Sequence, residues 1–184
     1  NLGSLQDIIL ENYAFACSGL QGAVQLPKLC GLEKAVFTGC KNLTALHFGE
    51  VEEGTALEAG LCNGCDSLQQ ITFADEQPPR LTLFSPGMEF RFNMEWPQNA
   101  DEEVKLHLSV PEGSEESYIS QWRYAVLGYV DMQETSRYMY ARRQILSELI
   151  WENLGGVHTS DAVDAKLEEK LLRSENYLRT MLGM

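Results

Sequence analysis

The feature of this sequence that most constrains its fold is a short internal repeat. Residues 40–48 and residues 65–73 both read C-x-x-L-x-x-(L/I)-x-F, and the second copy begins 25 residues after the first. An earlier copy begins at Cys17, 23 residues before the first of these, and carries one extra residue between Leu20 and Val24. A half-copy precedes it, with apolar residues at Leu5, Ile8 and Leu10. A period of about 20 to 30 residues predicts a solenoid built from stacked copies.

Each copy contains one short strand whose apolar face it cannot bury alone. Stacked copies bury these faces together, so the strands are expected to form a parallel ladder around one continuous core. Side chains along a strand point alternately to opposite faces. The residues expected to point inward are Val24, Leu26, Leu46, Phe48, Ile71 and Phe73. The residues expected to point outward are Ala23, Gln25, Ala45, His47, Gln70 and Thr72.

A cysteine begins each of the three longer copies, which places Cys17, Cys40 and Cys65 at one recurring corner. A buried free cysteine behaves as a small apolar residue with a weak S–H donor. We therefore expect these side chains to pack inside the ladder. Cys62 takes the slot that Phe37 fills one repeat earlier, which also indicates packing.

Further strands are expected after the last clear repeat. Residues 104–110 alternate apolar and polar residues, a pattern typical of a strand, and Pro111 ends it. We interpret this strand as the last rung of the ladder. Two shorter strands are expected at residues 81–84 and 90–94.

Three helices are expected to follow. The first has Ser114 as its N-cap, the second covers about residues 134–153, and the third begins near Ser160. Their inward residues are expected to be Tyr118, Ile119, Trp122, Val126, Tyr138, Ala141, Ile145, Leu146, Leu149, Ile150, Val163, Leu167, Leu171, Leu178 and Met181. The chain is thus predicted to be an α/β protein. Its predicted parts are a solenoid over residues 1–111 and a helical cap or small helical domain over residues 112–184.

At this point the repeat resembles a known family. Residues 37–48 and 64–73 are similar to the BspA-type leucine-rich repeats of bacterial cell-surface proteins. Residues 110–114, followed by Tyr118 and Trp122, resemble the segment that often closes such arrays. The resemblance covers residues 1–124 and departs from the family pattern at the insertion after Leu20, at Cys62 and over residues 75–104.

The resemblance implies a leucine-rich-repeat solenoid on an extracellular or cell-surface bacterial protein. Adhesion to a protein or glycan partner, host matrix proteins included, is the activity that it implies. No charged and then apolar signal region follows Asn1, so we expect a mature product or a truncated chain.

The charge balance argues against some other partners. The net charge is −13, with 14 basic and 27 acidic residues. A nucleic-acid binder needs clustered Lys and Arg to neutralise phosphates, and an anionic membrane surface attracts basic segments. No apolar run approaches the roughly 18 residues of a membrane span. We therefore expect neither nucleic-acid binding nor a membrane span.

The residue types that carry chemistry give weak signals. Cys62 and Cys65 have the C-x-x-C spacing of zinc and redox sites, but no second pair of zinc ligands follows and no βαβ setting surrounds them. We therefore interpret them as packing residues. The three histidines, His47, His107 and His158, lack a neighbouring nucleophile motif. Sequence alone does not test for a catalytic carboxylate pair, because its separation is a three-dimensional quantity.

These observations favour a non-catalytic interaction module without a metal or cofactor. The outward ladder face is the expected binding surface, because its residues vary without disturbing the core. The contact candidates are Gln25, His47, Gln70, Thr72 and His107. The alternative is a purely structural segment that caps or spaces a longer repeat protein.

Overall fold

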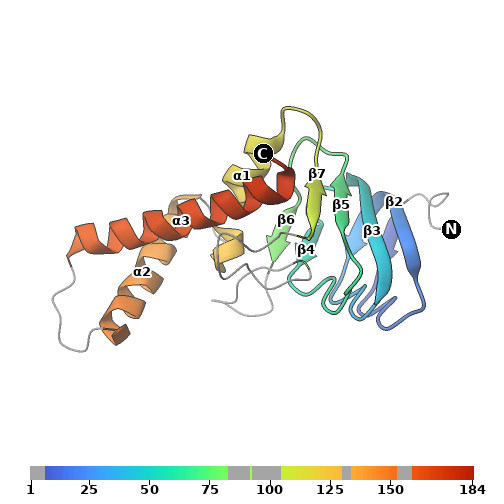
Figure 1. Cartoon of the computed structure of the whole chain (residues 1–184), viewed down its shortest axis with the longest axis horizontal. Helices are drawn as coiled ribbons and strands as arrows, with labels where there is room; N and C mark the ends of the chain where they lie inside the picture. Colours follow the sequence, from blue (N-terminus) through green and yellow to red (C-terminus); the bar gives the residue numbers. More distant parts are fainter. Residues whose placement is uncertain (1–6, 83–91, 93–104, 130–133, 153–158) are drawn as a thin grey trace.

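The computed structural model describes residues 7–82, 92, 105–129, 134–152 and 159–184, and Figure 1 shows a parallel β-solenoid of about three turns followed by helices. The larger sheet contains, in spatial order, β1 (Ile8–Leu10), β2 (Gln21–Leu32), β3 (Asn42–Val51), β5 (Gln70–Phe73) and β7 (His107–Ser109). The smaller sheet pairs β4 (Ala56–Glu58) with β6 (Arg80–Thr82). All of these pairings are parallel, as stacking of successive turns requires.

The predicted inward set is confirmed, since all six of its residues are buried. In register, Leu26 lies beside Phe48 and Phe48 beside Phe73. The two phenyl rings stack with centroids 5.2 Å apart and planes 9° apart. In the outward set, Ala45 lies in the row of Ala23 and Gln70 as predicted, although it is only 8% exposed. Its side chain is a single methyl group on a central strand, so the flanking strands β2 and β5 cover it.

The recurring corner differs by one residue from the predicted alignment. The amide of Phe15 donates to the Val36 carbonyl, and the next turn repeats this contact from Phe37 to Leu61. This register stacks Cys17 on Gly39 and Gly64, and all three have positive φ angles of 53°, 74° and 71°. Ser18 therefore takes the slot of Cys40 and Cys65, and its hydroxyl lies 3.5 Å from the Cys40 sulfur.

The predicted position of Cys17 in the buried slot is thus wrong, and its side chain is exposed. Assigning the slot to Ser18 also removes the apparent insertion after Leu20, because Val24 then follows Ser18 by six positions, as Leu46 follows Cys40. The register between β2 and β3 does shift by one residue between Gly22 and Ala23, where Thr44 of β3 has no partner in β2. Cys40 and Cys65 are buried as predicted, and each S–H donates over 3.0 Å to a carbonyl of the preceding turn.

The end of the ladder lies where it was predicted. β7 pairs with β5, and Leu106 and Leu108 are buried. Of the two shorter predicted strands, the first overlaps β6 of the smaller sheet at residues 81 and 82, and its last two residues lie outside the described ones. Most of the second, residues 90–94, lies outside the described residues, as does Val104.

Helix α1 (Glu115–Trp122) and the 3-10 helix η2 (Ala125–Leu127) follow the last strand. Tyr118 and Trp122 lie against Phe73, with ring centroids at 5.6 and 5.5 Å. Their polar atoms are satisfied, because Tyr118 donates to the Asp75 carbonyl and Trp122 to the Pro79 carbonyl. Amphipathic aromatic rings thereby close the apolar end of the ladder without leaving a buried donor unpaired.

The predicted capping role of the Ser114 side chain is wrong. Ser114 does precede α1, but its hydroxyl makes no capping hydrogen bond to the helix. It is buried and donates over 2.6 Å to the Pro111 carbonyl, so it stabilises the turn between β7 and α1 instead.

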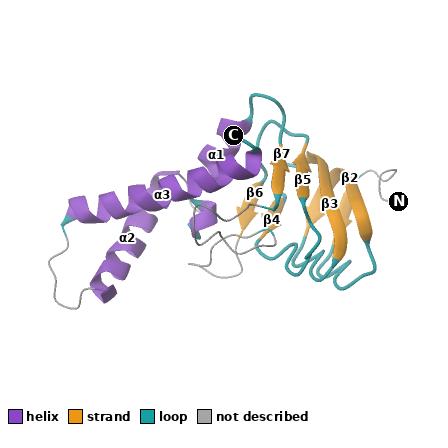
Figure 2. Cartoon of the chain, in the orientation of Figure 1, coloured by secondary structure: helices purple, strands orange, loops and turns teal. Residues whose placement is uncertain are grey.

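Helices α2 (Glu134–Glu152) and α3 (Ser160–Leu182) extend away from the strands as an arm (Figure 2). The arm has its own small core, in which Ala141 and Ile145 of α2 pack with Val163 and Leu167 of α3. Three residues of α2 that were predicted to face inward are exposed: Tyr138, Leu146 and Ile150. Helix α2 packs mainly against one neighbour, α3, so only a narrow stripe of its surface is covered.

The far end of α3 joins the core of the ladder. Leu178 and Met181 are buried in the same apolar cluster as Ile71, Phe73 and Leu108. Helix α3 also contacts β7 and α1 directly. A solenoid exposes its core at its ends, and these contacts cover that core beyond β7.

This cap can be tested at Met181, which is fully buried. Met181→Ala should lower the free energy of unfolding by about 2 to 5 kcal/mol, because the cavity it leaves at the end of the ladder is not refilled. The control is Leu172→Ala on the same helix. Leu172 is 59% exposed, and its change should be about 0.5 kcal/mol or less. Urea denaturation measures both. Equal small losses would show that α3 does not stabilise the ladder.

Candidate functional site

The outward face of the larger sheet gathers the predicted contact residues. Gln25, His47 and Thr72 occupy one row across β2, β3 and β5, and Ser109 of β7 completes that row. Gln70 and His107 are paired in the adjacent row. Neighbouring parallel strands lie about 4.8 Å apart, so the five predicted residues form one continuous surface.

The exposure of these residues differs along the rows. Gln25, Gln70 and His107 are exposed, whereas His47 and Thr72, on the inner strands, are half-buried. Gln70 donates to the Ser109 hydroxyl over 3.3 Å, which links the two rows. His158, the third histidine, lies outside the described residues.

The two rows carry no Asp, Glu, Lys or Arg, whereas Lys28 and Glu50 are paired farther along β2 and β3. The eight residues of the rows are Ala23, Gln25, Ala45, His47, Gln70, Thr72, His107 and Ser109. The whole chain has 22% charged residues and a net charge of −13. Depletion of charged side chains is a property of the centres of protein interfaces.

A groove on another part of the solenoid is the second candidate. It has a volume of about 570 Å³ and is lined by residues 30–34 after the middle of β2, by residues 53–56, and by Asn12, Glu58 and Thr82. The chain makes this groove by lengthening one turn. Phe37 follows Leu29 by eight positions, whereas Cys62 follows Val51, the stacked partner of Leu29, by eleven positions.

Glu58 is the most unusual side chain in the groove. It is 8% exposed, and burial raises the pKa of its carboxyl group, which the ammonium of Lys34 opposes. Oε1 lies 4.0 Å from Lys34 Nζ, beyond hydrogen-bond distance. Oε2 is buried and has no hydrogen-bond partner among the described residues. A buried carboxylate oxygen without a donor is energetically unfavourable and therefore calls for an explanation.

Repeat matching does not find this groove. It compares the residues that recur, and the groove consists of residues that one turn has and its neighbour lacks. The available signal was the change in spacing from 22 to 25 residues between stacked positions, together with Glu58 inside the longer segment.

Cys62 and Cys65 behave as packing residues in the structure. Both are buried, and the Cys65 S–H donates to the Phe37 carbonyl. A hydrogen bond between the two thiols raises the pKa of Cys62, as burial also does, and lowers the pKa of Cys65. A thiolate must be reachable to bind zinc or to attack a disulfide, and the burial of both side chains opposes this in the native fold. Within the described ranges, no group of three or more His, Cys, Asp or Glu side chains is placed to hold a metal ion.

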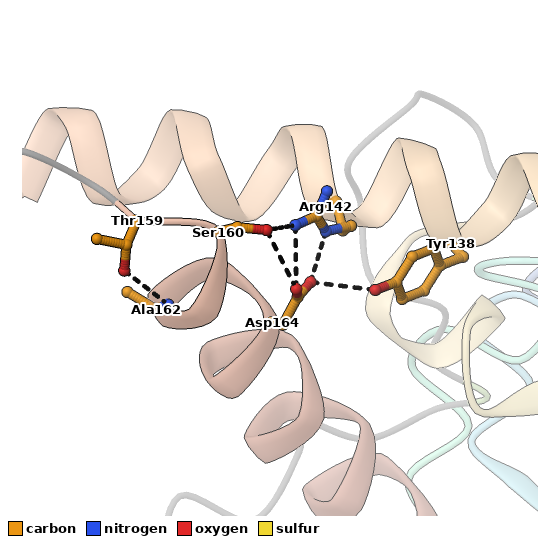
Figure 3. Close-up of polar contacts among 6 residues, drawn as sticks. All are labelled: Tyr138, Arg142, Thr159, Ser160, Ala162 and Asp164. Atoms are coloured by element: carbon orange, nitrogen blue, oxygen red, sulfur yellow. Dashed lines mark hydrogen bonds and ion pairs between the residues drawn. The ribbon is translucent and has the colours of Figure 1, made fainter.

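A polar cluster between α2 and α3 is the third candidate (Figure 3). Arg142 forms an ion pair with Asp164 and contacts the Ser160 hydroxyl, and Tyr138 donates to Asp164 over 3.1 Å. Thr159 caps α3 by accepting from the Ala162 amide. These groups satisfy one another, so the cluster joins the two helices and offers no unpaired group to a ligand.

No protein-family model, curated protein or solved structure matches this chain. In the part of the chain that the structure describes, no helix is both long enough and apolar enough to cross a membrane.

The burial of the thiols predicts their reactivity. In the native protein at about pH 8, Cys17 should react first with a thiol reagent, because it is exposed. Cys30 should follow only as the pH approaches its pKa of about 11, which partial burial and the neighbouring carboxylates raise. Cys40, Cys62 and Cys65 should react only on unfolding. Mass spectrometry of the labelled peptides gives the order, and rapid labelling of Cys62 or Cys65 would revive the metal and redox hypotheses.

The polar cluster predicts the local stability of the arm. Asp164→Asn should speed amide hydrogen exchange in α2 and leave the larger sheet unchanged, because Arg142 loses its carboxylate partner. The control is Glu168→Gln, an exposed residue on the same helix. A hydrogen bond from Arg142 lowers the pKa of Asp164 below 3.8. The stability that the Arg142–Asp164 ion pair contributes is therefore complete above the ordinary pKa of an aspartate. It is lost as the pH falls through the lower pKa that Asp164 has in the folded protein. Unchanged amide hydrogen exchange in α2 would show that the Arg142–Asp164 ion pair does not hold α2 against α3.

Proposed function

We propose that this chain is a non-catalytic interaction module that binds a protein or glycan on the outward face of its parallel ladder. By its resemblance to BspA-type leucine-rich repeats, we assign it to the surface of a bacterial cell or to a secreted bacterial protein. Adhesion is the activity that this resemblance favours, with host matrix proteins among the proposed partners. We expect no enzymatic reaction.

The observation that carries this proposal is the pair of uncharged, largely polar rows on the larger sheet of an acidic chain. A face that serves only to keep a protein soluble is usually charged, whereas this one presents amide, hydroxyl, imidazole and methyl groups in ordered rows. These groups match the hydrogen-bonding groups of peptides and sugars. The rows are held by β2, β3 and β5, so little side-chain and backbone freedom is lost when a partner binds.

A second candidate function is structural. The packing of α1 and α3 on the ladder favours it, because these helices cover apolar side chains that a solenoid would otherwise expose. On this view the chain terminates or spaces a longer repeat protein, and the outward face has no partner.

Binding to a panel of immobilised extracellular-matrix proteins and glycans distinguishes the two. The wild type should bind at least one member, and His47→Glu/Thr72→Glu should weaken that binding by about a hundredfold. Two carboxylates without partners would then be desolvated in the interface. The control, Asn63→Glu/Asn176→Glu, adds the same charge at exposed sites elsewhere and should bind as the wild type does.

Two results would contradict the proposal. Equal binding by the double variant and the wild type would remove the ladder face as the binding surface. A folded wild type that binds no member of the panel would favour the structural function.

A further inference from the structure

We propose that the groove around Glu58 is a second binding site, separate from the ladder face, for an organic cation such as the guanidinium group of an arginine side chain. The occupant donates to the Glu58 carboxylate and lies between residues 30–34 and the longer turn at residues 53–56. This site extends the proposed function and depends on different residues.

The first support is the incomplete hydrogen bonding of Glu58. Its nearest cation, Lys34, is 4.0 Å from Oε1, and the Lys34 side chain is 59% exposed. This long contact at the edge of the solvent only partly neutralises a buried carboxylate. An N–H group entering the groove would supply the short, charge-assisted hydrogen bond that the carboxylate lacks, and such bonds are the strongest that a neutral or ionic ligand offers.

The second support is the rigid placement of this carboxylate. Glu58 is the last residue of β4 and is paired in register with Thr82 of β6. The Thr82 hydroxyl donates to the Leu57 carbonyl, which further joins the two strands. The carboxylate therefore lies on an ordered sheet rather than on a loop, as a site that orients its ligand requires.

The charge and size of the groove favour an organic cation over other ligands. Glu33, Glu53 and Glu58 line the groove with one cation, Lys34, in a chain of net charge −13. Its volume of about 570 Å³ falls within the range of small-molecule sites. Among the described residues, no three His, Cys, Asp or Glu side chains converge to hold a metal ion, so these carboxylates do not form a calcium site. A planar guanidinium needs only one carboxylate and presents several donors to it.

The test uses the intact chain and two small probes, N-acetyl-arginine amide and its neutral isostere N-acetyl-citrulline amide. Isothermal titration or chemical-shift titration should show that the arginine probe binds about tenfold or more tightly than the citrulline probe. Glu58→Gln preserves the shape of the side chain and should weaken arginine binding by about ten- to a hundredfold. Equal binding of the two probes, or no effect of Glu58→Gln, would overturn the proposal.

A second variant covers the case in which Glu58→Gln does not fold. Lys34→Met retains the apolar stem but removes the cation that competes for Glu58, so arginine binding should tighten by roughly threefold. The control, Lys41→Met, removes an exposed cation outside the groove and should leave the affinity near the wild-type value. Unchanged or weaker binding in Lys34→Met would also overturn the proposal.

The ladder variant His47→Glu/Thr72→Glu should bind the arginine probe as the wild type does. Loss of probe binding in that folded variant would place the cation on the ladder face and overturn the groove assignment. If the ladder face binds no partner, the titration of the groove with the arginine probe is unaffected. Each of the two proposals can therefore be contradicted without the other.

Discussion

The structure depends on the register between one turn of the chain and the next. A single turn has apolar side chains on one face of its strand and nothing of its own to cover them. Leu26, Phe48 and Phe73 solve this together, because parallel pairing places them side by side. The same register aligns the corners, where the S–H groups of Cys40 and Cys65 reach carbonyl groups one turn earlier. Core packing, corner hydrogen bonds and the rows of outward side chains therefore all follow from one alignment.

Those parts of the fold that repeat were predictable from the sequence. Alternation of apolar and polar residues identified the complete inward set and the strand that ends the ladder. The recurring C-x-x-L pattern located the buried slots of Cys40 and Cys65. The outward rows followed from the same alternation, because side chains on one strand have only two faces. The family to which the repeat belongs stays a prediction, since the parallel ladder alone does not distinguish one class of solenoid from another.

The errors arose where the residue pattern of a segment does not determine which other segments pack against it. Cys17 matched the repeat by residue type, yet backbone hydrogen bonding gives that slot to Ser18, another small residue that carries a hydrogen-bonding group. The apolar period of α2 correctly predicted a helix but not how much of it would be covered, so Leu146 and Ile150 were misassigned. The groove at Glu58 results from three additional residues in one turn, which a search for similarity treats as a gap.

Helix α3 has a mechanical consequence for the whole chain. Its first half belongs to the core of the arm and its last turns belong to the core of the ladder. Its 23 residues form a continuous rod of about 35 Å, because an α-helix rises about 1.5 Å per residue. A load applied to α2 is therefore transmitted along this rod to Leu178 and Met181 and pulls on the packing beyond β7. The last rung of the ladder, rather than its middle, is the point at which tension on the arm would begin to open the solenoid.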